Sequence, residues 1–265
     1  MIKSFKSMKN LLLSYSILGN SRNPVLLVQH GMIASIKDAE LFRNMVDRNI
    51  CVVSIARPGY GDSSCYELKD ISEYGDIAAE LLDYLGISDF SVLGTSSGAP
   101  YALSVSHRLP ERTKSAFIFS GTPLLTNPHV AALWPYPLEQ GKSVAHFQKV
   151  ASEIFGWMSD PSRAGRNDVI DSRKNDFYGP ALDLKIRAED WGFSLAEIHG
   201  KVLYEHSLDD EQVPFRTASL TASLIPGSEF IKRDGGGHFS EDTLSRFLRE
   251  YVVPRISGEK TAGGH

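Results

Sequence analysis

Short apolar runs alternate along this chain with segments in which apolar residues recur every three or four positions. The runs predict strands at 11–18, 24–29, 50–56, 90–93, 115–120, 201–205 and 229–232. The helical spacing predicts helices at 37–46, 72–85, 99–109, 214–224 and 240–253, with Ser72 as the N-cap of the second. This alternation favours an α/β fold, in which helices flank a mostly parallel sheet and the first two strands form its antiparallel start.

The alternation breaks between residues 124 and 198, where no strand-like run occurs and aromatic residues accumulate. Residues 144–158 carry apolar side chains at helical spacing, which predicts a helix buried on one side. Residues 163–175 are polar and predict a mobile connection between helices. We therefore expect a core built from residues 1–123 and 199–265, with 124–198 as a helical insertion and a frayed tail at 257–265.

Composition and charge narrow the classes of partner. The chain has 265 residues, a net charge of −4 and dispersed Lys and Arg, so it carries no electrostatic footprint for nucleic acid or an anionic membrane. We expect a small-molecule substrate, and both a monomer and a homodimer stay open. Cys51 and Cys65 form no disulfide framework in a chain of this size, which favours a reducing, cytoplasmic location.

The N-terminus has some features of a signal peptide. Lys3, Lys6 and Lys9 precede an apolar run at 11–13. Polar residues interrupt that run at once, and no clean cleavage site follows. We expect an edge strand here, and no stretch of the chain approaches the roughly 20 apolar residues of a membrane span.

The sequence Gly-Thr-Ser-Ser-Gly at 94–98 lies between an apolar strand and a helix. In a sharp strand-turn-helix connection the central residue adopts a strained backbone conformation, and flanking glycines avoid collisions with neighbouring elements. The central residue here is Ser96. Its hydroxyl is expected at the carboxyl end of the sheet, where it can serve as a nucleophile.

A serine nucleophile needs a base to take its proton and an acid to orient that base. His238 follows the last predicted strand within a glycine-rich loop, and it is the expected base. Asp210 follows the preceding strand and is the expected acid. Two alternatives stay open: Asp209 as the acid, and His206, directly after its strand, as the base.

Two backbone amides complete the expected site. Met32 follows a strand that ends in His30-Gly31, and Ser97 follows the nucleophile. Both amides are placed to form an oxyanion hole that stabilises a tetrahedral intermediate. His30 itself is expected to be structural, and so is the compact Arg57-Pro58-Gly59-Tyr60-Gly61 turn.

These motifs resemble the α/β-hydrolase superfamily over nearly the whole chain. The order serine, acid, histidine matches that family, and residues 92–103, 57–61 and 191–193 are similar to a broad bacterial subgroup of it. The resemblance implies a central sheet, a helical cap between the strands near 120 and 201, and no cofactor or metal. It implies as site residues Ser96, Asp210, His238 and the amides of Met32 and Ser97.

Two positions depart from the subgroup's pattern. Ser207 stands where many relatives have glycine before the acid, which bears on the choice between Asp209 and Asp210. Residues 32–35 replace a smaller run that contains Gly or Pro, which is expected to narrow the acyl side of the pocket.

The function expected from these residues is a serine hydrolase that cleaves a small or medium apolar carboxylic ester through an acyl-enzyme. Three alternatives stay open. They are an aminopeptidase of the proline-iminopeptidase type, a carbon-carbon bond hydrolase and a slow-turnover ligand receptor that retains the triad. Dehalogenase and epoxide-opening chemistry are disfavoured, because those relatives carry Asp where Ser96 stands.

Overall fold

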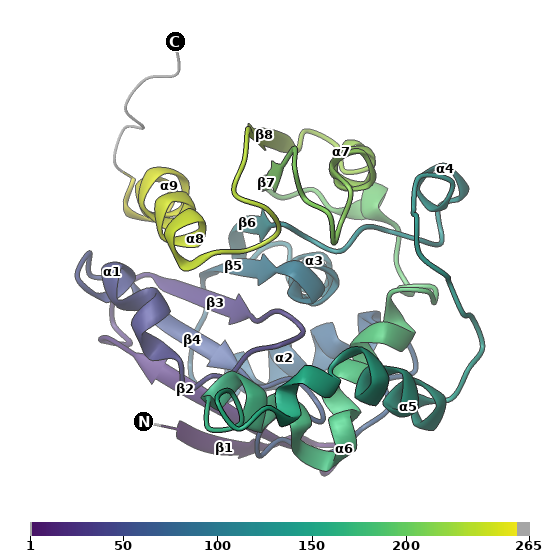
Figure 1. Ribbon diagram of the computed structural model, residues 1–265. Coiled ribbons are helices and arrows are strands. Elements are labelled where there is room, and N and C mark those ends of the chain that lie inside the picture. The colour runs from purple at the N-terminus through teal and green to yellow at the C-terminus, as the bar shows by residue number, and fades with distance from the viewer. Residues whose placement is uncertain (1, 259–265) are drawn as a thin grey trace.

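The computed structural model describes residues 2–258, which fold around an eight-stranded sheet (Figure 1). The strands lie in the order β1-β2-β4-β3-β5-β6-β7-β8, and all neighbours from β4 to β8 run parallel. This arrangement confirms the expected fold class. The strands are β1 (Ile2–Lys6), β2 (Leu12–Leu18), β3 (Val25–Gln29), β4 (Cys51–Ile55), β5 (Phe90–Thr95), β6 (Thr113–Phe119), β7 (Val202–Ser207) and β8 (Glu229–Arg233).

Helices cover both faces of the sheet. Strands β3, β4 and β5 are buried along their whole length, as continuous apolar runs predict for parallel strands. Helices α2 (Ser72–Tyr84), α3 (Ala99–Arg108) and α7 (Phe215–Ser223) contribute to the core on one face. The other face is covered by η1 (Ala39–Phe42), α1 (Arg43–Val46), α8 (Glu241–Phe247), the π-helical η5 (Leu248–Val252) and α9 (Val253–Ser257) (Figure 1).

The antiparallel start of the sheet differs from the prediction. Strands β2 and β3 do not pair; β2 runs antiparallel to both β1 and β4. The short helical segment at 39–46 carries the chain from β3 to its parallel neighbour β4, and β4 therefore separates β2 from β3.

The start of α2 also differs from the prediction. Ser72 is the first residue of the helix rather than its N-cap. Asp70 provides the acceptor instead, because its Oδ1 lies 2.5 Å from Ser72 Oγ and 3.3 Å from the amide nitrogen of Glu73.

The segment 124–198 is helical and contains no strand. It comprises α4 (Pro128–Ala131), α5 (Val144–Ile154), η3 (Gly156–Ser159), α6 (Asn167–Ile186) and η4 (Leu195–Glu197). The connection expected at 163–175 is mostly wrong, because α6 begins at Asn167. Only residues 174–177 leave the helical conformation, and three of them have φ values of 54°, 54° and 60°. The polar composition of this segment suggested a loop. Its Asp171 is nevertheless buried in the helix, where it contacts Lys37 at 2.7 Å.

Two further expectations concern the C-terminal tail and the absence of a membrane-spanning helix. Most of the predicted frayed tail, residues 259–265, lies outside the described residues. Within residues 2–258, no helix combines the length and the apolar character needed to cross a membrane.

Candidate active site

Ser96 lies at the tip of the turn between β5 and α3, in the short 3-10 segment η2 (Ser96–Gly98). Its φ is +50°, a left-handed conformation that is unfavourable for a residue with a side chain. A Cβ on Gly98 would lie 2.1 Å from the carbonyl oxygen of Gln29, and one on Gly94 would lie 2.8 Å from Ala99 Cα. Only glycine therefore lets β5, α3 and the end of β3 approach this closely.

The structure brings Ser96, His238 and Asp210 together. His238 Nε2 lies 2.8 Å from Ser96 Oγ, and His238 Nδ1 lies 2.8 Å from Asp210 Oδ2. A carboxylate only accepts hydrogen bonds, so Nδ1 carries the proton and Nε2 is left to accept the serine proton. This arrangement gives the serine a base and gives the base a fixed tautomer.

Asp210 is buried but surrounded by donors. Its Oδ1 accepts from the amide nitrogens of Gln212 and Val213, each at 2.9 Å. Burial by itself raises the pKa of the carboxyl, but hydrogen bonds from His206, His238 and the Val213 amide outweigh it, so the pKa is lowered. The carboxylate therefore remains ionised beside His238.

His206, the alternative base, contacts the acid and not the serine. Its fully buried Nε2 lies 3.0 Å from Asp210 Oδ2 and 2.8 Å from the carbonyl oxygen of Val213. Both neighbours are acceptors, so Nε2 carries a proton. His206 thus acts as a second imidazole donor to Asp210.

Asp209, the alternative acid, faces the loop before His238. It accepts from the amide nitrogens of Gly236 at 3.2 Å and Gly237 at 2.9 Å. Ser207 Oγ also donates to it, and these hydrogen bonds lower its pKa. Ser207 and the glycine loop therefore both hold Asp209, and Asp210 is the carboxylate that contacts His238.

The two segments expected to carry the oxyanion-hole amides lie next to Ser96. A Cβ on Gly31 would lie 3.6 Å from Ser96 Cβ, so the segment 30–32 runs beside the serine. Ser97 occupies the first turn of η2, where amides have no partner within the helix. The loop after β3 and the segment η2 therefore carry the two amides expected of the oxyanion hole.

His30 adopts a structural arrangement. Burial, and next the positive charge of Arg57, lower its pKa well below the ordinary value. Its Nε2 accepts from the amide nitrogen of Arg57 at 3.3 Å, and its Nδ1 donates to the carbonyl oxygen of Gly31 at 2.7 Å. A neutral imidazole with both nitrogens engaged is not available for proton transfer.

One buried carboxylate beside the site was missed by the sequence prediction. Asp183 of α6 lies 2.5 Å from Arg57 Nη2 and 2.8 Å from the hydroxyls of Tyr60 and Tyr101. Burial raises its pKa, against the opposing effects of Arg57 and the two hydroxyls. The only feature of the sequence that pointed to this site was Arg57, which lies in a turn expected to be structural. Asp183, the partner of Arg57, lies 126 residues further along the chain.

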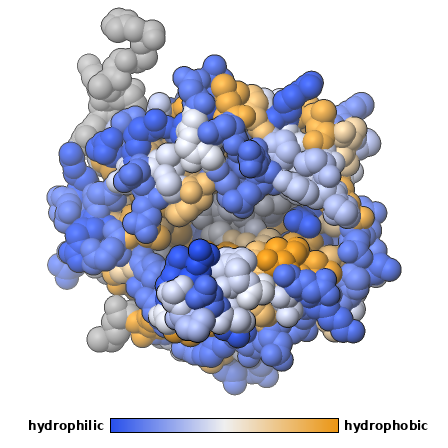
Figure 2. Space-filling view, in the orientation of Figure 1, coloured by the Kyte–Doolittle hydropathy of each residue, from blue (hydrophilic) through white to orange (hydrophobic). Residues whose placement is uncertain are grey.

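A depression in the surface lies over this site. Figure 2 shows the viewed face hollowed near its centre, at the place where Figure 1 shows β5 meeting α3, with apolar residues on its lower right border. Residues 2–258 contain no cluster of three or more His, Cys, Asp or Glu suited to holding a metal ion.

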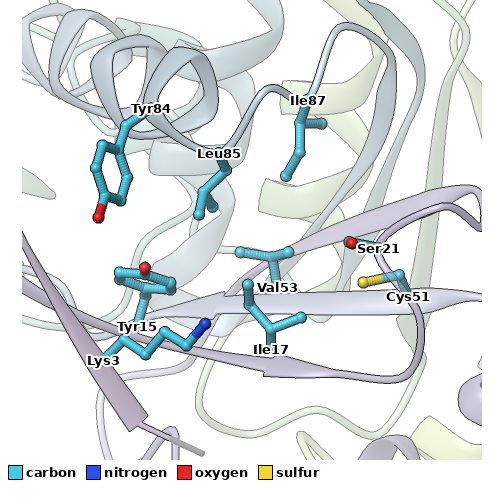
Figure 3. Close-up of a pocket in the computed structure, with 9 residues that line it drawn as sticks. All are labelled: Lys3, Tyr15, Ile17, Ser21, Cys51, Val53, Tyr84, Leu85 and Ile87. Atoms are coloured by element: carbon cyan, nitrogen blue, oxygen red, sulfur yellow. The ribbon is translucent and has the colours of Figure 1, made fainter.

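A separate cavity of about 340 Å³ lies at the other end of the strands (Figure 3). Apolar side chains form its floor, and Lys3, Tyr15 and Ser21 add polar groups. None of the expected site residues lines it. The cavity is therefore not part of the candidate active site.

The fold and the site together define a class: proteins with a serine on a sharp strand-helix turn, a histidine and a carboxylate at one edge of a mostly parallel sheet. A family model described as "Alpha/beta hydrolase family" matches residues 25–250. The chain belongs to this family.

Individual relatives are distant. A poly(3-hydroxyalkanoate) depolymerase of Ectopseudomonas oleovorans is 26% identical over 227 residues, which cover 81% of this chain and 78% of that protein. The uncharacterized hydrolase YcgS of Bacillus subtilis is 26% identical over 103 residues, or 39% of this chain and 36% of that protein. The structure of an esterase from Exiguobacterium antarcticum matches with a TM-score of 0.74 at 17% identity, covering 97% and 98% of the two chains. That structural likeness shows a shared fold.

The contact at Gly98 predicts a large loss of stability on substitution. Gly98→Ala should lower the free energy of unfolding by about 3 kcal/mol or more, because the new Cβ would collide with backbone oxygens. Gly156→Ala is the matched control, since no atom lies within 4 Å of its Cβ position. Urea unfolding measures both, and equal stability of the two variants would contradict the predicted collision.

The lowered pKa of Asp210 predicts a pH-dependent contribution to stability. A carboxylate whose folded pKa is depressed stabilises the fold above its unfolded pKa, about 3.9 for Asp, and loses this contribution as the pH falls toward the folded value. Asp210→Asn should therefore be less stable than the wild type at pH 7, and the difference should shrink from about pH 5 to pH 2. Chemical unfolding across this range tests it; a difference independent of pH would show that the charge of Asp210 contributes nothing.

Proposed function

We propose that this protein is a serine hydrolase that cleaves a small or medium apolar carboxylic ester through an acyl-enzyme. The observation that carries the proposal is the continuous hydrogen-bonded series from Ser96 Oγ through His238 to Asp210. The strained backbone at Ser96 and the segment 30–32 beside it add to this support.

In the proposed reaction, Ser96 Oγ attacks the ester carbonyl carbon while His238 Nε2 takes the hydroxyl proton. The carbonyl oxygen gains negative charge and accepts from the amides of Met32 and Ser97. The intermediate collapses as the C–O bond to the alcohol breaks, and His238 returns its proton to the departing oxygen. Water then attacks the acyl-enzyme with the same proton transfers, which releases the acid and restores Ser96.

Asp210 stabilises the charged form of His238 during both steps. It holds the Nδ1 proton in place and lies opposite the positive charge that forms on the imidazole. The donors around it keep it ionised, so it does not take that proton itself.

The apolar substrate preference rests on the surroundings of Ser96. Met32 is partly buried and packs against the main core, and Leu208 and Phe239, which flank the acid and the base in sequence, are exposed at 47% each. The relative from Exiguobacterium antarcticum is named an esterase, which supports ester cleavage.

Active-site labelling combined with turnover tests the proposal against its alternatives. A fluorophosphonate should label Ser96, and uncharged p-nitrophenyl esters should be hydrolysed. Labelling without turnover would favour a receptor, and failure to label would contradict the triad. Preference for an amide with a free amino group, or for a carbon-carbon substrate, would move the protein to the aminopeptidase or carbon-carbon hydrolase alternative.

Removal of each triad group should abolish most of the activity. Ser96→Ala, His238→Ala and Asp210→Asn should each lower kcat by about 10³-fold or more, and double variants should add little because the three groups act as a unit. Asp209→Asn is the control, because Asp209 contacts the glycine loop and not His238. Steady-state ester kinetics measure these effects. A severe loss in Asp209→Asn with near-normal activity in Asp210→Asn would reverse the assignment of the acid.

The proposed preference for a small or medium acyl group predicts a limit on acyl length. Each added methylene should gain about 0.8 kcal/mol until the pocket is full, after which overpacking reverses the trend. We expect kcat/KM for p-nitrophenyl esters to peak at a short or medium acyl chain. A steady rise out to palmitoyl esters would contradict this and favour a lipase.

A further inference from the structure

Asp183 is a buried charge outside the triad with three hydrogen-bond partners, and it belongs to α6 of the helical insertion. Its side chain is 1% exposed and that of Arg57 is 0% exposed. Arg57, Tyr60 and Tyr101 all direct their donors at this one carboxylate. The guanidinium also lies over the rings of Tyr101, at 4.4 Å, and Tyr60, at 5.1 Å.

Two of these three partners also hold the segment 30–32 by its carbonyl oxygens. Arg57 Nη1 donates to the carbonyl oxygen of His30, and Arg57 Nη2 lies 3.3 Å from that of Gly31. Tyr60 Oη lies 2.8 Å from the carbonyl oxygen of Met32. Tyr101 contacts Asp183 but makes no hydrogen bond to this segment among the described residues.

Holding these oxygens fixes the direction of the Met32 amide. The carbonyl of Gly31 and the N–H of Met32 belong to one planar trans peptide, in which the two groups point in opposite directions. Arg57 and His30 hold the Gly31 oxygen, so the N–H of Met32 points away from these two side chains. The hydroxyl of Tyr60 shares its single proton between the carbonyl oxygen of Met32 and Asp183 Oδ2, and this contact restrains the next peptide.

The carboxylate of Asp183 is what keeps Arg57 in this place. Burial is the largest single influence on the pKa of Arg57 and lowers it, but Asp183 together with the neighbouring tyrosines outweighs burial, so the pKa is raised and the guanidinium stays charged within the core. Without Asp183, a buried cation would have only carbonyl dipoles and aromatic faces around it, and a move toward water would be favoured.

We propose that Asp183 is a positioning residue for the oxyanion hole. The Met32 amide keeps its direction only while Asp183 of α6 contacts Arg57 and Tyr60. This proposal rests on the proposed hydrolase function. Loss of the network should impair stabilisation of the oxyanion more than binding of the ester, because the ground-state carbonyl depends less on the amide of Met32.

Tyr60→Phe and Tyr101→Phe form a matched pair for the test. Each removes one hydroxyl from the same carboxylate, but only Tyr60 also holds the segment 30–32. We expect Tyr60→Phe to lower kcat about 10-fold or more with KM changed less than about 3-fold, and Tyr101→Phe to keep kcat within about 3-fold. Equal losses in both variants, or an unchanged kcat in Tyr60→Phe, would overturn the proposal.

Asp183→Asn tests the carboxylate itself, and Asp183→Glu tests rescue by restored charge. Asp183→Asn should lower kcat at least as much as Tyr60→Phe, and Asp183→Glu should recover part of the loss. Thermal unfolding identifies any variant that fails to fold. The tyrosine pair decides the proposal in that case, because those changes leave Arg57 and Asp183 paired.

The rate of fluorophosphonate labelling separates this proposal from the proposed function. Phosphonylation of Ser96 places an oxygen in the same hole, so its second-order rate constant reports the hole even without ester turnover. Absence of ester turnover in the wild type would contradict the proposed function. Equal labelling rates in the wild type, Tyr60→Phe and Asp183→Asn would contradict the positioning role.

Discussion

The close approach of the β5–α3 turn to the end of β3 is the constraint on which the site depends. Gly98 lies against the carbonyl oxygens of Gln29 and His30 with no room for a Cβ. Because of that contact, Ser96 and the segment 30–32, which carries the Met32 amide, are held in fixed positions relative to one another. The backbone strain at Ser96 is therefore held by packing on both sides and not by the turn alone. Displacement of either strand end would move the nucleophile relative to the Met32 amide.

The acid and the base reach this junction on two loops that hold each other. Asp210 lies at the end of β7, and His238 follows β8, the neighbouring parallel strand. Asp209 binds the glycine loop that precedes His238, while His206 and two amides bind Asp210. Adjacent acidic residues thus have separate tasks, since one fixes the backbone and the other faces the imidazole.

Local pattern in the sequence was enough to predict the strands from β5 onward in outline, and the residues that meet at Ser96. Apolar runs, glycines with close contacts and polar residues at strand ends are all short-range signals. The prediction failed where a distant partner decided the structure. Residues 167–173 have the composition of a polar loop, and only the distant Lys37 explains why Asp171 is buried there. In the same way, only Arg57 explains why Asp183 is buried in a helix. Such pairs, over a hundred residues apart, leave no periodicity to detect.

The pairing of Arg57 with Asp183 is better explained by geometry than by stability. The desolvation of two charges largely offsets their attraction, so a buried ion pair adds little net stability compared with an apolar replacement of the same shape. An apolar replacement, however, could not donate to the carbonyl oxygens of His30 and Gly31. A guanidinium offers a planar fork of donors, and a carboxylate on α6 fixes where that fork points. In the proposed role, the insertion therefore acts on the site through the orientation of a peptide.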